Sequence, residues 1–376
     1  MRHPYSTYHS NLYPGAAEKH EMRPPDMGGF FMGAEPRETL KDKSATGRER
    51  PWRTHKRTSR AVAASLWRIY QAHPKKNAWA KKRSDRIQQC SNYLQFGDYA
   101  NTESGEVTRR LVAAQFCRDR LCPMCAWRKS LVMFSQISQI MDWVAERKET
   151  VPIFLTLTVR NCPGEELADT IDRLLKSWSR MMNSKSNRKP WKVSLGWFRA
   201  LEITYNKSEN TWHPHIHAIV LVEPDYFTDE TKYIDQPSWI AEWRRALGVD
   251  YDPSVDVRTV KGDRAKAVAE VAKYTVKPGE WLDLDDAEGT DARVELLAKV
   301  LKNRRLTALG GLMKEAKKAL ALDDVESADL VLTDAEKAEL RGEVLVALIR
   351  FEWQIGPTNY VCTEIQQVEP PQFEET

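Results

Sequence analysis

The central part of the chain, residues 148–280, alternates between two sequence patterns in an order that restricts the fold more than any other feature. Short runs rich in β-branched and apolar residues indicate strands at 153–159, 197–205, 213–222 and 255–260. Helical spacing of apolar residues indicates helices at 165–182, 237–247 and 263–276. The resulting order, β-α-β-β-α-β-α, predicts an α+β fold of the split βαβ, or ferredoxin-like, type. We expect an antiparallel sheet with helices on one face and the other face free for a site.

The parts of the chain on either side of this core differ from it. Residues 1–50 are rich in Pro, Gly, His, Ser and charge without periodicity, which predicts a flexible arm. Helical periodicity around a group of cysteines predicts a basic, helical, cysteine-rich unit at 51–147. Residues 281–376 are predicted to be mainly helical, with a break at Gly310-Gly311 and a late β-like stretch at 350–361.

The net charge of +4 hides an uneven distribution. Fifteen Lys or Arg residues stand against three acidic residues between Arg37 and Arg83, with three tryptophans among them. Such a segment suits a polyanion, although a solvated basic tail without a partner is the alternative. The longest apolar runs are too short to cross a bilayer, and the N-terminal residues lack the apolar core of a signal peptide. We therefore expect a cytoplasmic protein with no membrane partner.

Three histidines alternate with other residues in a predicted strand, at His213, His215 and His217. Side chains alternate between the faces of a strand, so all three project from one face, where neighbouring pairs can bind one metal ion. We predict His215 and His217 as ligands. His213 is a third ligand, a supporting partner or a DNA contact. Surface histidines on an edge strand are the alternative.

Glu202 lies in the other arm of the predicted hairpin, within an otherwise apolar and β-branched run. If the turn lies near 207–210, the Glu202 carboxylate sits across from the histidine strand and completes a set of two imidazoles and one carboxylate. Hairpin register cannot be fixed from sequence, so a Glu202 that faces solvent on the outer side of the sheet is the alternative.

A further stripe is predicted on the helix at 263–276, where spacings of four and three place Glu270, Tyr274 and Lys277 on one side. A tyrosine hydroxyl can act as a covalent nucleophile when its ionisation is assisted, and a carboxylate one turn away can later activate water. Lys277 can offset negative charge on the phenolate or on a phosphate. A packing tyrosine flanked by surface charges is the alternative.

Four cysteines form another candidate site, namely Cys90, Cys117, Cys122 and Cys125. A C-x-x-C pair with two further cysteines predicts a structural zinc site, while Cys162 and Cys362 are expected to be buried thiols. Basic residues surround the cluster and could present cations to DNA phosphates, with solvated charge as the alternative. They are Arg118, Arg120, Arg128 and Lys129.

Three segments in this order resemble the rolling-circle replication initiators of small plasmids, which belong to the His-hydrophobic-His endonuclease superfamily. They are FLTLTVRN (154–161), HPHIHAIV (213–220) and EVAKYTVK (270–277). The cysteine segment FCRDRLCPMCAWRKS (116–130) and the later segment RRLTALGGLMKEAKKALALDD (304–324) are also similar to this family. The resemblance covers roughly residues 90 to 355.

The resemblance implies a metal-dependent, site-specific endonuclease that nicks one strand of plasmid or phage origin DNA and later rejoins strands. His215 and His217 would bind Mg²⁺ or Mn²⁺, Tyr274 would form a 5′-phosphotyrosine link, and Glu270 would help water to end the cycle. With one tyrosine in its third motif, the chain resembles the single-tyrosine class. Thr156, Thr158 and Asn161 of the first motif are expected to hold DNA or orient the ligands.

The implied partners are double-stranded and single-stranded origin DNA, a host helicase and a DNA polymerase. A separate helicase is expected because the sequence lacks the G-x-x-x-x-G-K-[ST] motif of P-loop nucleotide-binding proteins. The C-terminal region, 281–376, would serve origin binding or oligomerisation, with a homodimer as one form. A relaxase or single-strand transposase of the same superfamily is an alternative. A non-enzymatic, zinc-dependent DNA-binding regulator is the alternative of another class, and it predicts binding without nicking.

Overall fold

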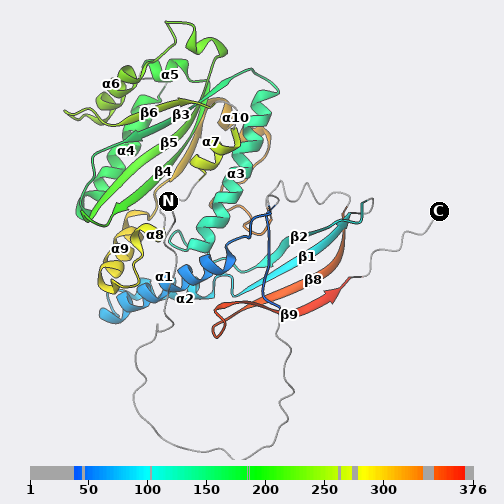
Figure 1. Ribbon diagram of the computed structural model, residues 1–376. Helices are drawn as coiled ribbons and strands as arrows, with labels where there is room; N and C mark the ends of the chain where they lie inside the picture. The colour runs from blue at the N-terminus through cyan, green and yellow to red at the C-terminus, as the bar shows by residue number, and fades with distance from the viewer. Residues whose placement is uncertain are drawn as a thin grey trace, which may run out of the picture. The chain divides into compact units, whose positions relative to one another are not determined.

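The computed structural model contains two antiparallel sheets and the helices that pack on them (Figure 1). The part of the chain that it describes comprises 38–44, 47–101, 104–183, 185, 187–260, 264–272, 278–332 and 343–368. Within these ranges no helix combines the length and the apolar character that a membrane crossing requires.

The larger sheet has five strands in the order β6-β3-β5-β4-β7, and all neighbouring strands are antiparallel. Its strands are β3 (Val151–Thr158), β4 (Gly196–Asn206), β5 (Thr211–Val222), β6 (Val255–Thr259) and β7 (Thr307–Gly310). Among the strands β3 to β6, β6 lies beside β3, and β5 lies between β3 and β4. This is the split βαβ arrangement, so the predicted α+β fold is confirmed.

Two helices cover one face of the five-stranded sheet, as the alternation of strands and helices predicted. They are α4 (Leu167–Met181) and α6 (Gln236–Leu247). Strand residues Leu155 and Ile216 are fully buried on this face and belong to one core with Trp178 of α4 and Trp243 of α6. Short elements connect this layer, namely η1 (Gly164–Glu166), α5 (Lys189–Val193) and η3 (Pro224–Phe227).

The opposite face of this sheet is partly covered, so the expectation that it is free was wrong. Three helices contribute to the core on this face, α3 (Pro123–Ala145), α7 (Arg264–Val271) and α10 (Gly311–Ala319). Ile140 of α3 and Val268 of α7 pack with Phe198 and Ile219 of the sheet. The apolar side of α3 predicted a buried helix, but its sequence does not show which sheet it covers, because α3 precedes the βαββαβ unit.

The smaller sheet has four strands, in the order β2-β1-β8-β9. They are β1 (Tyr93–Asn101), β2 (Val107–Ala114), β8 (Glu343–Gln354) and β9 (Asn359–Gln367). The prediction of a helical unit at 51–147 was therefore wrong for β1 and β2. The β-like stretch predicted at 350–361 matches the end of β8 and the start of β9, and the mainly helical prediction was wrong for the rest of these two strands. Both errors have one cause: Leu94 pairs with Phe351, and a pairing over such a sequence separation leaves no local periodicity.

Four further helices belong to the described part of the chain, α1 (Trp52–Ala72), α2 (Ala78–Gln89), α8 (Pro278–Trp281) and α9 (Ala287–Val300). Trp52 of α1 meets Phe96 of β1 edge to face, with ring centroids 6.1 Å apart, and Phe96 meets Phe351 of β8 at 5.9 Å. The smaller sheet thus shares a core with α1.

The predicted flexible arm at 1–50 is wrong for its last part. Leu40 is buried, Thr39 bridges to Val361 of β9, and the Trp52 indole N–H donates to Asp42 at 2.7 Å. Residues 38–44 and 47–50 therefore belong to the folded unit, while residues 1–37 lie outside the described part of the chain.

Gly310-Gly311, predicted as a break in a helix, joins the end of β7 to the start of α10. Gly311 has φ +54°, and a β-carbon there would collide with the carbonyl oxygen of Leu195 and approach the α-carbon of Gly196 to 2.8 Å. Both the backbone angle and the close approach therefore require glycine. Gly248, which ends α6 with φ +69°, has nothing within 4 Å of the same point.

These two glycines predict different costs for the same substitution. Gly248→Ala should lower the free energy of unfolding by about 1 kcal/mol, because only the left-handed backbone is penalised. Gly311→Ala should cost roughly 1 to 3 kcal/mol more, because the added methyl group also meets backbone atoms. Urea unfolding of both variants measures the difference, and equal losses would show that the β7–α10 junction relaxes around the methyl group.

Candidate functional site

His213, His215 and His217 project from one face of β5, and the register of the β4–β5 hairpin places Glu202 directly across from His215. The turn lies at 207–210, where the sequence predicted it. Glu202 Oε2 is 2.9 Å from His217 Nε2 and 3.5 Å from His215 Nε2. All three residues are buried, since only 4%, 7% and 9% of the surface of Glu202, His215 and His217 is exposed.

The second nitrogen of each imidazole has its own hydrogen-bond partner. His215 Nδ1 lies 3.0 Å from the backbone oxygen of His213, and His217 Nδ1 lies 3.1 Å from Thr156 Oγ1. This arrangement is typical of metal-binding histidines, in which a hydrogen bond at one nitrogen fixes the ring so that the other can coordinate. Two Nε2 atoms and one carboxylate oxygen, all within 4.8 Å of one another, therefore fit a divalent cation. We call Glu202, His215 and His217 the histidine group.

His213 lies beside this group rather than in it. Its ring stacks on that of His215, with centroids 5.0 Å apart and planes inclined by 28°. Burial lowers the pKa of His213. The structure thus favours a supporting position for His213 over that of a third ligand.

The first motif lies beside the histidine group, because β3 pairs Thr156 with His217 and Thr158 with His215. Thr156 orients His217, whereas the Thr158 hydroxyl donates to the backbone oxygen of Ser254 at 2.9 Å. The guanidinium of the exposed residue Arg160 lies 3.9 Å from the centre of the Tyr251 ring. This cation–π contact was not predicted from the sequence. Tyr251 lies in a polar loop after α6, and no local pattern connects it with the first motif.

The stripe predicted around Tyr274 is only partly described. Glu270 is half-buried on α7, and Tyr274 and Lys277 lie outside the described residues. Val271 and Ala272, at the end of α7, are buried in the same core as Ile219, which follows His217 on the same face of β5. The described part of the third motif therefore packs on the face of the sheet that carries the histidine group.

The four cysteines predicted as a zinc site are brought together from three places in the chain. Cys90 ends α2, Cys117 lies in the loop after β2, and Cys122 and Cys125 begin α3. Their sulfur atoms all lie within 4.8 Å of one another. The backbone N–H of Arg118 donates to Cys125 Sγ at 3.2 Å, and that of Cys117 donates to Cys90 Sγ at 3.4 Å. We call these four residues the cysteine group.

Hydrogen bonds bias one thiol of this group toward its ionised form. Burial opposes ionisation of Cys122, but hydrogen bonds from the other three thiols and from Ser59 outweigh it and hold the Cys122 pKa well below its usual range. Four sulfurs at mutual contact, three of them on buried residues and that of Cys117 on a half-buried one, fit the donor set of a structural metal site.

A fully buried lysine, Lys56, lies next to the cysteine group and was missed. Its ammonium donates to the backbone oxygens of Gln88 and Cys90 at 3.1 and 2.5 Å and to Asn92 Oδ1 at 2.7 Å. Burial lowers the Lys56 pKa to about 8, and the nearby cysteines act in the opposite direction. The sequence does carry a signal, because Lys56 falls on the helical stripe that includes Trp52, Ser59 and Ala63, all of which are buried.

The prediction that Arg118, Arg120, Arg128 and Lys129 present charge to DNA was wrong for Arg128. Arg128 is fully buried, donates to the backbone oxygens of Leu330 and Val331 at 2.7 Å, and lies over the rings of Trp52 and Trp127. It therefore holds α3 against a later segment.

The other three basic residues all contact Glu326. Lys129 and Arg120 form ion pairs with the Glu326 carboxylate at 2.5 and 3.4 Å, and Arg118 donates to its backbone oxygen. Arg118 remains exposed, whereas Arg120 and Lys129 are half-buried. Much of the charge around the cysteine group thus serves packing within the chain.

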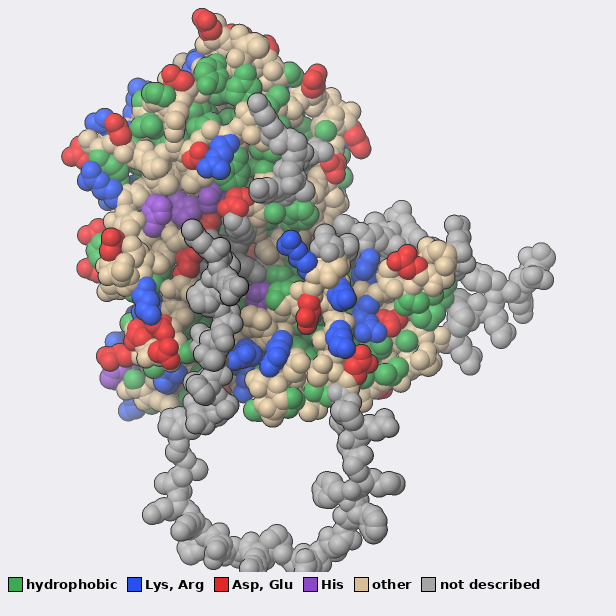
Figure 2. Space-filling model, viewed as in Figure 1, with side chains coloured by type: hydrophobic (Ala, Val, Ile, Leu, Met, Phe, Trp, Pro, Cys, Tyr) green, Lys and Arg blue, Asp and Glu red, His purple; other side chains and the backbone are tan. Residues whose placement is uncertain are grey.

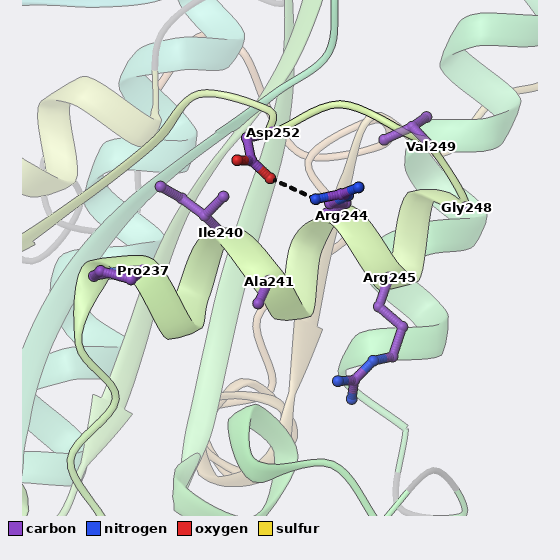
Figure 3. Close-up of a pocket in the computed structure, with 8 residues that line it drawn as sticks. All are labelled: Pro237, Ile240, Ala241, Arg244, Arg245, Gly248, Val249 and Asp252. Atoms are coloured by element: carbon purple, nitrogen blue, oxygen red, sulfur yellow. Dashed lines mark hydrogen bonds and ion pairs between the residues drawn. The ribbon is translucent and has the colours of Figure 1, made fainter.

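Figure 2 shows histidine side chains reaching the surface as a row beside acidic side chains, and Lys and Arg side chains gathered over α1 and the neighbouring strands β1 and β2. A separate hollow of about 450 Å³ lies along α6, where Pro237, Ile240 and Val249 line it and Arg244 pairs with Asp252 (Figure 3). Because α6 covers the other face of the sheet, this hollow is not part of the histidine group.

Comparison with known proteins agrees with these observations. The sequence profile of a family described as "Replication protein" matches residues 108–361. A "Protein rep" of Streptococcus pneumoniae serotype 2 is 36% identical over 327 residues, which cover 85% of this chain and 94% of the relative. A "Protein rep" of Bacillus amyloliquefaciens is 35% identical, with 86% and 96% covered, and a "Replication protein" of Staphylococcus aureus is 38% identical, with 61% and 98% covered. No solved structure matches significantly.

The two threonines of β3 provide a test of the histidine group. Thr156→Val keeps the shape of the side chain but removes the hydroxyl that fixes His217, so Mn²⁺ affinity should fall roughly 10- to 100-fold. Thr158→Val is the matched control, because its hydroxyl bonds to a backbone oxygen and not to a histidine. Isothermal titration with Mn²⁺ measures both variants, and an unchanged affinity in Thr156→Val would contradict the assigned role.

Proposed function

Because this chain belongs to the replication protein family, we propose that it initiates rolling-circle replication of a plasmid by nicking one strand of the origin. The observation that carries this proposal is the histidine group, which combines Glu202, His215 and His217 on one sheet face. Two imidazoles and a carboxylate suit a divalent metal, and α7, which leads into the third motif, packs on the same face.

We assign Mg²⁺ or Mn²⁺ to the histidine group. When bound there, the ion would supply Lewis-acid polarisation of the scissile phosphate. The chain's own residues would position it, because Thr156 and the backbone of His213 orient the two imidazoles and Glu202 supplies the negative charge.

Tyr274 is the proposed nucleophile. Its phenolic oxygen would lose its proton and form a bond to the phosphorus while the bond from phosphorus to the 3′ oxygen breaks. The departing 3′ oxygen would take up a proton in exchange and become a 3′-OH. The product is a 5′-phosphotyrosine link. Lys277 would offset negative charge at this step. Support comes from the sequence of the third motif and from the packing of α7, whose last described residues are buried beside the histidine strand.

Glu270 is the proposed base of the second half of the cycle, since it lies one helical turn before Tyr274 in the sequence. It would take a proton from water so that a second cleavage ends replication, and strand transfer would close the released circle. A host DNA polymerase is a proposed partner because the released 3′-OH is the end that polymerases extend. A host helicase would expose the single strand that reaches the site.

The α1–α2 region is the proposed surface for origin DNA. Residues 52–89 contain eleven Lys or Arg residues and one acidic residue, Asp85. Several of these cations are exposed, namely Arg53, Arg57, Arg68, Lys75, Lys76, Lys81, Lys82 and Arg86. Phosphates dominate affinity for DNA through release of counterions, so an exposed helix pair with this excess of positive charge favours a nucleic-acid partner.

The cysteine group is the proposed site of a structural Zn²⁺. Four cysteine sulfurs are one of the donor sets typical of structural zinc sites, and three of the four residues, Cys90, Cys122 and Cys125, are buried. The ion would join the end of α2, the loop after β2 and the start of α3.

The nuclease proposal is tested by incubating the wild-type chain and Tyr274→Phe with supercoiled origin DNA and Mn²⁺. A denaturing gel should show protein-linked DNA for the wild type and none for Tyr274→Phe. Tyr233→Phe is a matched control, because Tyr233 is an exposed tyrosine after the far end of β5. An adduct that persists in Tyr274→Phe would overturn the choice of tyrosine, and DNA binding without nicking would favour a non-enzymatic regulator.

The proposed DNA surface predicts a change in salt dependence. In Arg57→Gln/Lys82→Gln, each lost phosphate contact should reduce the slope of log affinity against log salt by about 0.9. The control, Lys148→Gln/Lys192→Gln, removes two exposed lysines outside α1 and α2, one after α3 and one in α5. Fluorescence anisotropy with duplex DNA at several salt concentrations measures the slopes, and equal slopes in both double variants would exclude α1–α2 as the surface.

A further inference from the structure

We propose that Lys56 is the charge-balancing partner of the metal ion in the cysteine group, an inference that rests on the proposed Zn²⁺ site. Lys56 lies in α1 and contributes no ligand. Its ammonium is fully buried, and its three hydrogen-bond acceptors are neutral oxygens of Gln88, Cys90 and Asn92. A buried positive charge whose hydrogen bonds go to neutral acceptors is costly unless a negative charge lies nearby.

The metal-loaded cysteine group supplies that negative charge. Four thiolates around one divalent ion carry a net charge of −2, which is itself costly in a buried site. The Lys56 ammonium holds the backbone oxygen of Cys90, the residue whose sulfur belongs to the group. Each of the two buried charges therefore offsets the cost of the other, provided that the metal is bound.

A second residue of α1 supports this arrangement. Ser59 follows Lys56 by one helical turn, and its hydroxyl oxygen lies 3.4 Å from Cys122 Sγ. The same oxygen accepts from the backbone N–H of Met124 at 3.2 Å, so its own hydrogen is available to the sulfur. Cys122 also occupies the N-cap position of α3, where the helix dipole favours negative charge. One side of α1 and the start of α3 thus both stabilise anionic sulfur.

A structural role for Lys56 makes a different prediction. Its bond to the oxygen of Gln88 caps the C-terminus of α2, and a lysine can serve there without any metal. A cap would stabilise the metal-free and the metal-loaded protein by the same amount. A charge-balancing partner would act on the metal-loaded state, so the two roles are separated by metal affinity and not by stability alone.

The experiment measures Zn²⁺ and Co²⁺ affinity of the full chain by competition with a chromogenic chelator. Lys56→Met removes the charge and should weaken both metals roughly 10- to 100-fold, while Lys56→Arg keeps the charge and should stay within a few-fold of wild type. Ser84→Ala is the matched control, because the Ser84 hydroxyl bonds α2 to the backbone oxygen of Ala63 in α1 without touching a cysteine. Its metal affinity should not change.

If Lys56→Met does not fold, Lys56→Gln gives the same test, since it keeps a donor for the α2 carbonyls but no charge. Equal affinity in the wild type and the neutral variant, or an equal loss in Ser84→Ala, would overturn the proposal and leave Lys56 as a helix cap. A wild-type protein whose Co²⁺ complex lacks thiolate charge-transfer absorption would overturn the metal site itself. Neither result tests nicking, so both outcomes leave the nuclease proposal unaffected.

Discussion

The pairing of β4 with β5 is the constraint on which the candidate site depends. Glu202 faces His215 because this hairpin has one particular register, and a slip by one residue would turn every side chain of β5 to the other face. The histidines would then enter the core under α4 and α6, where Leu201 and Ile203 are now buried. Two features hold the register. Apolar side chains fill both faces beyond the site, and Asn206 accepts backbone and side-chain hydrogen bonds from the turn.

Much of this sheet could be predicted because the patterns that indicate its strands lie within short stretches of the sequence. The alternation in HPHIH placed the histidines on one face. A polar turn near 207–210 was compatible with Glu202 opposite them, but the register itself is given only by the pairing in the structure. The four-stranded sheet could not be predicted in the same way, since β1 and β8 meet over more than 240 residues and β1 contains Gly97 and Asp98, which weaken a strand pattern. Arg128 and Lys56 were misread or missed for another reason: charged residues are assumed to be exposed, and only their place on apolar helical stripes indicates burial.

Helix α3 connects the two candidate metal sites. Its first turn holds Cys122 and Cys125, and its later turns, including Ile140 and Val144, pack with α7 and with the face of the sheet that carries the histidines. A structural ion at the start of this helix would therefore help to fix where α7 lies. The family similarity spans both regions, since the matched residues, 108–361, include the cysteines of α3 and the histidine strand. The cysteine group and the histidine group are thus linked through the packing of one helix, α3.

The pairing of β1 with β8 also determines the order in which a growing chain can fold. All strands of the five-stranded sheet have been synthesised once Gly310 leaves the ribosome, whereas β1 and β2 must wait for residues 343–367 to complete their sheet. The core beneath α1 includes Phe351, so this basic helix also gains its final support late. Contacts over long sequence separations form slowly. A nascent chain would therefore hold a formed histidine sheet before α1, the helix of the proposed DNA surface, has its complete core.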